Sequence, residues 1–207
     1  MPMKLYYGKT SPYVRKVLVA AIELGIEGDI ERQEILPWDP ATTYGDINPL
    51  GKIPALVTNA GRLLYDSRVI VEHLDSLSGK ATLIPADHDA RMECLRIASL
   101  GDGLMEAMIL LYSELERRPP ALRWGYWDDR MRGKVDRALE CLETDSRDFD
   151  TDRPDLAQIT VACGVAWLGF REKILGIDPL KGRPALARWF DAFAGRPSMV
   201  ATVPVAH

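Results

Sequence analysis

The apolar pattern of this 207-residue chain changes character once, at Gly79. Before Gly79, short alternating segments are interleaved with stretches of helical spacing, and after it the apolar residues repeat at helical intervals. Such a change predicts two different layers of structure in one chain. We expect an α/β domain over residues 1–80, a linker over 81–89 and an all-helical domain over 90–207.

The first domain is expected to run in the order β-α-β and then β-β-α. Pro12 is expected in the first turn of the first helix, where a missing N–H costs nothing, and Gly25 is expected to end that helix. Ser67 is a candidate N-cap for the second helix. The expected strands are residues 3–7, residues 30–36, and a hairpin of residues 55–58 and 62–65.

The helical domain is expected to begin with a long helix over residues 91–116. Its apolar residues fall on two faces, so both faces must be buried. A second helix is expected over residues 130–149. Asp155 and Gln158 have the spacing of a capping box at the start of a central helix, and Pro184 is expected to start the last one.

Composition favours a protein without a nucleic-acid partner. The net charge is −4, with 26 basic and 30 acidic residues, whereas nucleic-acid binding needs clustered excess base. The three cysteines, Cys94, Cys141 and Cys163, are far apart and fit no metal spacing, which is typical of reduced thiols. No secretory signal or membrane-spanning run is visible, so a soluble, cytoplasmic protein is expected.

Ser11 is the first residue that could carry chemistry. It precedes an expected helix start, where backbone N–H groups and the helix dipole favour negative charge. Its hydroxyl could donate to a thiolate and so lower the thiol pKa. No partner base is evident, so Ser11 itself is not expected to be a nucleophile. For an isolated Ser-Pro, simple helix capping is by far the more common explanation.

The second candidate is the segment Lys52-Ile53-Pro54. A cis bond before Pro54 would expose the backbone N–H and C=O of Ile53, and a short peptide could pair with them as an added strand. Lys52 could face a carboxylate, although a solvated surface lysine is the more common role for a residue in this position.

The third candidate is Asp66-Ser67. A hydroxyl and an N–H at a helix start can hold a carboxylate, while Asp66 can meet an ammonium group, which suits the free amino-acid end of a ligand. Capping is the simpler explanation here too. Tyr6 and Tyr7 compete with Ser11 as the activating hydroxyl, and strand alternation allows only one of them to face a ligand.

The ordered set of motifs resembles the cytosolic glutathione S-transferase superfamily over the whole chain. It is most similar to serine-type and bacterial members, whose first motif is Ser-Pro-[Phe/Tyr]-x-x-Arg. The corresponding segment here is Ser11-Pro12-Tyr13-Val14-Arg15-Lys16. The resemblance implies a thioredoxin-like first domain and an all-helical second domain. The Asp155-x-x-Gln158 sequence stands where the family usually has Ser/Thr-x-x-Asp.

By resemblance, Ser11 matches the thiol-activating serine, and Ile53 with cis Pro54 matches the edge that binds the cysteinyl backbone of glutathione. Asp66 and Ser67 match the acid-serine pair that holds the γ-glutamyl end. The glycyl carboxylate has no clear match, and Trp38 and Lys52 are only candidates.

The resemblance implies a detoxifying transferase that uses glutathione as co-substrate and no metal. Its thiolate would attack a small electrophile held near Met105, Met108 and Tyr112, and a homodimer is expected because of the two-faced helix. One alternative is a regulatory or interaction protein of the same fold without turnover. Another is a glutathione-dependent peroxidase or disulfide reductase, which would have to act without a cysteine at position 11.

Overall fold

The computed structural model describes residues 2–79 and 82–205 of the chain. They form two compact units, one containing residues 1–85 together with 197–207 and the other residues 86–196. The first boundary falls inside the predicted linker, whose first residue, Ala81, lies outside the described residues. The difference from the predicted division is at the C-terminal end, where the chain returns to the first unit.

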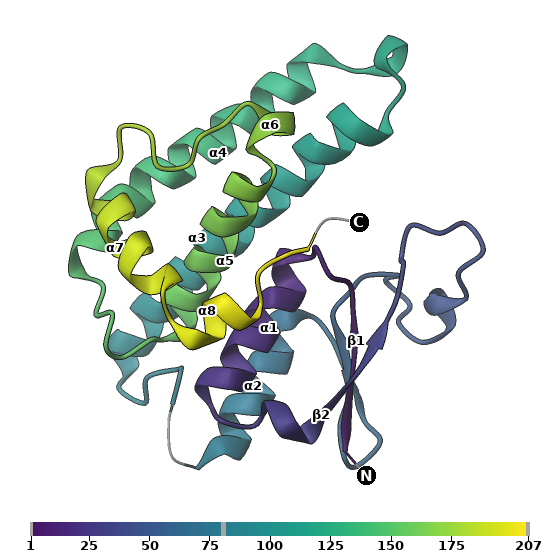
Figure 1. Ribbon diagram of the computed structural model, residues 1–207, viewed down its shortest axis with the longest axis vertical. Helices are drawn as coiled ribbons and strands as arrows, with labels where there is room; N and C mark the ends of the chain where they lie inside the picture. The colour runs from purple at the N-terminus through teal and green to yellow at the C-terminus, as the bar shows by residue number, and fades with distance from the viewer. Residues whose placement is uncertain (1, 80–81, 206–207) are drawn as a thin grey trace. The chain divides into compact units, whose positions relative to one another are not determined.

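A four-stranded sheet with the order β2-β1-β3-β4 organises the first unit (Figure 1). β1 (Met3–Tyr7) lies parallel to β2 (Ile30–Glu34). On its other side β1 pairs antiparallel with β3 (Ala55–Val57), and β3 pairs antiparallel with β4 (Leu63–Leu64). The predicted strands and the predicted hairpin are therefore confirmed.

Two helices of the first unit pack against each other on one side of this sheet (Figure 1). They are α1 (Pro12–Glu23) and α2 (Ser67–Ser78). Pro12 occupies the first turn of α1, and Gly25 follows its end with φ 69°, a backbone conformation that glycine adopts without strain. Both predicted ends of α1 are confirmed.

The start of α2 differs from the prediction by one residue. Asp66 is the N-cap, and its Oδ1 accepts the backbone N–H of Arg68 at 3.0 Å. Ser67 is instead the first helical residue and is buried. The shift follows from competition between neighbours, since a carboxylate caps as well as a hydroxyl does.

The second unit is helical, as the periodicity predicts. Its helices are α3 (His88–Tyr112), α4 (Gly125–Asp145), α5 (Leu156–Phe170), α6 (Glu172–Leu175) and α7 (Pro184–Ala194). α3 packs against both α4 and α5. A Cβ at Gly101 would lie only 3.0 Å from Thr160 Cγ2, so the glycine permits a close approach of α3 and α5. The two apolar faces of α3 are thus largely covered within the unit itself.

The helix starts of the second unit show which capping predictions hold. Asp155 Oδ1 accepts the backbone N–H of Gln158 at 2.8 Å, so the predicted N-cap of α5 is confirmed. The reciprocal bond of a capping box does not form, because the Gln158 side chain binds the carbonyl of Arg153 and the indole N–H of Trp189 instead. Pro184 starts α7 as predicted.

The sequence pattern did not predict several short elements. These are α6, α8 (Pro197–Ala201), a π-helical turn at Ser113–Arg117, and 3₁₀ turns at Glu27–Asp29, Tyr44–Asp46, Pro120–Leu122 and Ser146–Asp148. Periodicity cannot reveal elements of three to five residues, because they are shorter than the repeat on which it depends. In the described part of the chain, no helix combines the length and apolar character needed to cross a bilayer.

Candidate functional site

Ser11 lies at the start of α1 and caps it. Its backbone is extended, with φ −78° and ψ 124°, and its Oγ accepts the backbone N–H of Val14 at 3.3 Å. The Ser11 N–H in turn donates to the carbonyl of Gly8 at 3.2 Å. Capping occupies a lone pair of the hydroxyl and leaves its hydrogen for another acceptor. The capping explanation and the thiol-activating explanation are therefore compatible.

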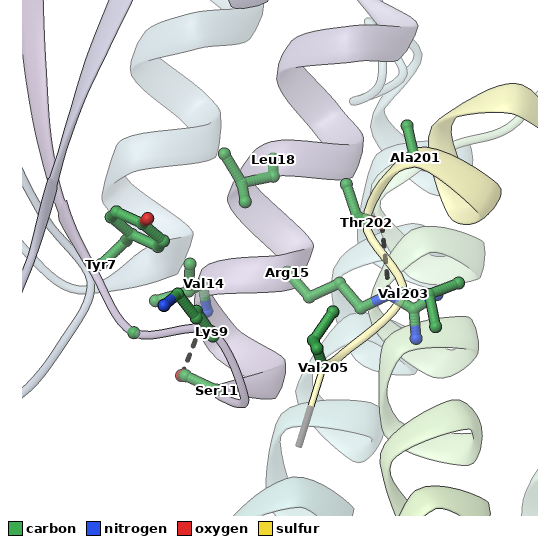
Figure 2. A pocket seen from close by; sticks show the side chains of 11 residues that line it. Tyr7, Lys9, Ser11, Val14, Arg15, Leu18, Ala201, Thr202, Val203 and Val205 are labelled. Carbon is green, nitrogen blue, oxygen red and sulfur yellow. Dashed lines mark hydrogen bonds between the residues drawn. The ribbon is translucent and has the colours of Figure 1, made fainter. Parts of the chain in front are cut away.

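The two tyrosines of β1 point in different directions, as strand alternation requires. Tyr6 is buried in a small apolar cluster, with its ring centroid 5.7 Å from that of Tyr44. Tyr7 lines the pocket that contains Ser11 (Figure 2). Of the two tyrosines, Tyr7 is therefore the one that competes with Ser11 for a ligand in that pocket.

The pocket beside Ser11 has a volume of about 130 Å³ and is built entirely within the first unit. One wall is the start of α1 and the loop before it, with Lys9, Ser11 and Arg15. The opposite wall is the segment that follows α8, where Val203 and Val205 are exposed (Figure 2). A helix start with an open hydroxyl, faced by apolar side chains, suits a ligand with an anionic atom and an apolar part.

Arg15 ties the C-terminal segment to α1. Its guanidinium donates from Nη2 to the carbonyl of Met199 at 2.8 Å and from Nε to Thr202 Oγ1 at 3.2 Å. The Arg15 residue is 7% exposed, and burial of this kind requires such partners. The C-terminal wall of the pocket is thus held by an arginine one turn after Ser11.

The Ile53–Pro54 peptide bond is cis, as the family resemblance implies. The Ile53 side chain lies so close to the loop before Ser11 that a Cβ at Gly8 would meet its Cδ1 at 2.6 Å. The structure therefore brings together two of the three predicted motifs, and Gly8 is the residue that permits the contact. Gly8 belongs to none of the predicted motifs.

Two further residues that the sequence analysis missed hold the backbone next to Ile53. The carbonyl of Lys52 accepts the Tyr44 hydroxyl at 3.1 Å and the Asn48 side-chain N–H at 2.6 Å. Burial, opposed by the hydrogen bond with Asn48, raises the pKa of Tyr44 to about 12, so its hydroxyl stays protonated at neutral pH. The Lys52 side chain itself is exposed, as is Trp38.

The third motif follows the hairpin. The bond between Tyr65 and Asp66 is also cis, and the Asp66 side chain is exposed while it caps α2. Ser67 is 2% exposed at the first position of that helix. The start of α2 thus presents a carboxylate at the surface and holds a buried hydroxyl beside it.

The residues predicted to line an electrophile pocket are all on α3. Met105 and Met108 are fully buried, and Met105 Cγ would lie 3.4 Å from a Cβ at Gly164 of α5. Tyr112 is half-buried. Among the three, Tyr112 therefore has the surface that a ligand could contact in this structure.

The described residues include no cluster of metal-ligating side chains, and the Cys94 thiol is buried. Among the described residues, no group of three or more His, Cys, Asp and Glu side chains could hold a metal ion. Cys94 is buried, and burial followed by the charge of Asp155 raises the pKa of its thiol to about 12. A thiol with that pKa is a poor nucleophile at neutral pH.

Comparison with known proteins identifies the family. The family model of the glutathione S-transferase N-terminal domain matches residues 10–77. The family model of the glutathione S-transferase C-terminal domain matches residues 126–192. The uncharacterized GST-like protein YibF of Escherichia coli K12 is 33% identical over 206 residues, which are 98% of each chain.

Solved structures agree with this match. A glutathione transferase family member of Pseudomonas fluorescens Pf-5 with bound glutathione is 40% identical, with a TM-score of 0.91 over 99% of this chain and 100% of that chain. A Pseudomonas fluorescens Pf-5 structure with bound S-(propanoic acid)-glutathione is 39% identical, with a TM-score of 0.89 over 98% and 100%.

A thioredoxin-like unit with a serine-capped first helix, followed by a helical unit, defines a glutathione-transferase-like protein. The chain belongs to the glutathione S-transferase superfamily.

Proposed function

We propose that this protein is a glutathione S-transferase that binds glutathione in its first unit and conjugates it to small electrophiles. The observation that carries the proposal is the position of Ser11, whose hydroxyl caps α1 with its oxygen and keeps its hydrogen for a ligand. Two structures of one relative at about 40% identity, one with bound glutathione and one with bound S-(propanoic acid)-glutathione, support this assignment.

In the proposed complex, the backbone of Ile53 pairs with the cysteinyl residue of glutathione, next to cis Pro54. Asp66 and Ser67 hold the γ-glutamyl end, and Lys52 is a candidate for a carboxylate. The support for this placement is the contact between Ile53 and Gly8, which joins the edge to the loop that carries Ser11. The fixed carbonyl of Lys52 supports it further.

In the proposed reaction, the protein stabilises the thiolate of glutathione. The Ser11 hydroxyl donates to the sulfur, and the start of α1 supplies a positive dipole, so the thiol loses its proton more readily. The thiolate then forms a C–S bond with the electrophile. Either a leaving group departs with the electron pair, or the neighbouring carbon of an activated alkene takes a proton from water.

The protein is further proposed to be a cytoplasmic homodimer with a role in detoxification. The two-faced apolar pattern of α3 motivated the dimer, but α4 and α5 cover much of that helix within one chain. Support for a second copy now comes from apolar side chains that stay exposed on α3, Met92 at 47% and Leu110 at 36%.

Two other functions compete with conjugation. A regulatory protein of this fold would need neither glutathione nor turnover. A peroxidase or disulfide reductase would use bound glutathione itself as the reductant, because position 11 holds serine and cannot form a mixed disulfide. Both stay open because the fold is shared by all three.

The test is turnover with glutathione and a panel containing aryl halides, activated alkenes, a peroxide and a mixed disulfide. The proposal expects conjugation, and a rate loss of about 10²-fold or more in Ser11→Ala. Ser11→Asp is the matched control for capping, because aspartate caps a helix as well as serine does but offers no hydrogen to a thiolate.

Ser11→Asp is therefore expected to keep the stability of α1 and to lose conjugation, while Ser11→Thr should keep part of it. Turnover of the peroxide or disulfide alone would favour the reductase. Glutathione binding without any turnover, or no binding at all, would favour the regulatory protein.

A further inference from the structure

Arg171 ends α5 inside a group of aromatic rings. Its guanidinium carbon lies 4.5 Å from the ring centroid of Phe170, 4.8 Å from that of Tyr112 and 5.9 Å from that of Trp167. The rings of Tyr112 and Trp167 are themselves in edge contact, with centroids 5.8 Å apart. Stacking on several rings fixes the plane of the guanidinium before any ligand arrives.

Within the described part of the chain, no acidic side chain neutralises the charge of this guanidinium. Nε of Arg171 is fully buried and has no hydrogen-bond partner, and among the residues that the structure describes no carboxylate pairs with the side chain. A buried donor without an acceptor is costly, and most such groups in native proteins have a reason. A ligand that supplies an acceptor would remove that cost.

A second arginine lies close to the same place. Arg117 is in the π-helical turn that follows α3, five residues after Tyr112. Burial lowers the pKa of Arg117, the nearby Tyr112 hydroxyl raises it, and the positive charge of Arg171 lowers it again. Two guanidinium groups that repel each other beside a phenol form a surface that favours an anion.

We propose that Arg171, with Arg117 and the hydroxyl of Tyr112, binds the carboxylate of an acidic electrophile. That the ligand is an electrophile rests on the proposed function. That it carries a carboxylate rests on the contacts of Arg171, Arg117 and Tyr112. A planar guanidinium held by rings matches a planar carboxylate, which can accept two parallel N–H groups. The substrate class is thus an activated alkene or aryl halide that carries a carboxylate.

Glutathione could also supply the carboxylate, since it carries two. The residues proposed to bind glutathione all lie in the first unit, whereas Arg117, Arg171 and Tyr112 lie in the second. We assign the carboxylate to the second substrate as part of the proposal, and the experiment separates the two sources.

The experiment measures the affinity of the full chain for cinnamate and for its neutral amide, cinnamamide, without glutathione. The wild type should bind the acid at least about tenfold more tightly than the amide. Arg171→Met keeps an apolar side chain among the rings and should bring the two affinities together. Arg117→Met should reduce the preference by a smaller factor.

The matched control is Arg188→Met, which removes an exposed positive charge from α7 and should leave the preference unchanged. Circular dichroism checks that each variant is folded. If Arg171→Met is unfolded, the affinities of Arg117→Met for the acid and the amide are used instead. Equal affinities for acid and amide in the wild type would overturn the proposal, as would a preference that survives in both arginine variants.

Glutathione titration of the same variants identifies the source of the carboxylate. Unchanged glutathione affinity with a lost acid preference supports the assignment to the electrophile. If Arg171→Met loses glutathione affinity and the wild type shows no preference for the acid, the site binds glutathione. This result would overturn the proposal. An acid preference in a protein that does not bind glutathione would keep the carboxylate site and reject only the proposed function.

Discussion

Two side chains at helix starts combine a capping role with a proposed ligand contact. Ser11 and Asp66 each accept a backbone N–H of their own helix, and each is also a proposed contact to glutathione. A capping oxygen is already positioned by the backbone, so little side-chain freedom has to be lost when a ligand binds. The residues that cap are therefore well suited to bind.

At this scale, Ser67→Ala should weaken glutathione binding more than it lowers turnover at saturating glutathione. The proposed contact is to the γ-glutamyl end, away from the reacting sulfur, so the ground state and the transition state share it. Titration and steady-state kinetics on the same variant test this. A fall in turnover with unchanged affinity would contradict the role, and Ser76→Ala, at an exposed position of α2, is the control.

The elements show how distant segments of the chain support the pocket. Arg15 on α1 holds the carbonyl of Met199 and the hydroxyl of Thr202, so the wall after α8 depends on one guanidinium. In the second unit, Glu143 of α4 accepts the N–H groups of Ala185 and Leu186 at 3.0 and 2.9 Å and so caps α7 from outside.

Arg15→Met should release the C-terminal segment from α1. Hydrogen bonds from a charged donor are worth about 2 kcal/mol in favourable cases, and the variant loses both of them. Hydrogen–deuterium exchange should become faster in residues 197–205 and stay unchanged in α7. Unaltered exchange in residues 197–205 would mean that Arg15 does not hold the segment.

Glu143→Gln should destabilise the protein by about 1 kcal/mol at neutral pH through a weaker cap on α7. Burial alone would raise the pKa of Glu143, but the backbone N–H groups of Leu186 and Ala185 outweigh it, and the pKa lies below its ordinary value. A carboxyl with a lowered folded pKa stabilises above its unfolded pKa, and this contribution is lost as pH falls through the folded pKa.

The difference in unfolding free energy between wild type and Glu143→Gln should therefore shrink on acidification below the ordinary carboxyl pKa. Denaturant titrations at neutral and acidic pH measure it. Glu106→Gln, an exposed acid of α3, is the control. A difference that grows as pH falls would contradict the assignment.

Elements with a periodic pattern and a cap could be predicted, and elements held by distant contacts could not. α1 and α5 carry their start signals in adjacent residues, so Pro12 and Asp155 revealed them. The fixed carbonyl of Lys52 depends on Tyr44 and Asn48, and α8 depends on Arg15, 184 residues away from Met199. No local pattern records such partners.

For the whole molecule, the family follows from ordered motifs spread along the chain, each of which is weak alone. The order of Ser11, Ile53-Pro54 and Asp66-Ser67, followed by a helical pattern, indicates the superfamily by resemblance. The contacts of Arg171 with the rings of Phe170, Tyr112 and Trp167 were not predicted, because cation–π contacts have no sequence signature.

A homodimer is the prediction that concerns the whole molecule. Sedimentation at micromolar concentration should give twice the chain mass of 23.1 kDa. If the exposed Met92 and Leu110 belong to the interface, Met92→Lys with Leu110→Lys should shift the equilibrium to monomer, because two charges would have to be buried. A wild type that sediments as a monomer would contradict the prediction.

The ionisation of the glutathione thiol on the protein tests the central claim most directly. The ultraviolet absorbance of the thiolate, followed against pH at saturating glutathione, gives the pKa of the bound thiol. An ordinary thiol has a pKa of about 8.5, and the wild type should lower it by at least about one unit. Ser11→Ala should return it toward the ordinary value. A bound thiol that titrates like free glutathione, or one whose pKa rises in Tyr7→Phe and not in Ser11→Ala, would contradict the role of Ser11.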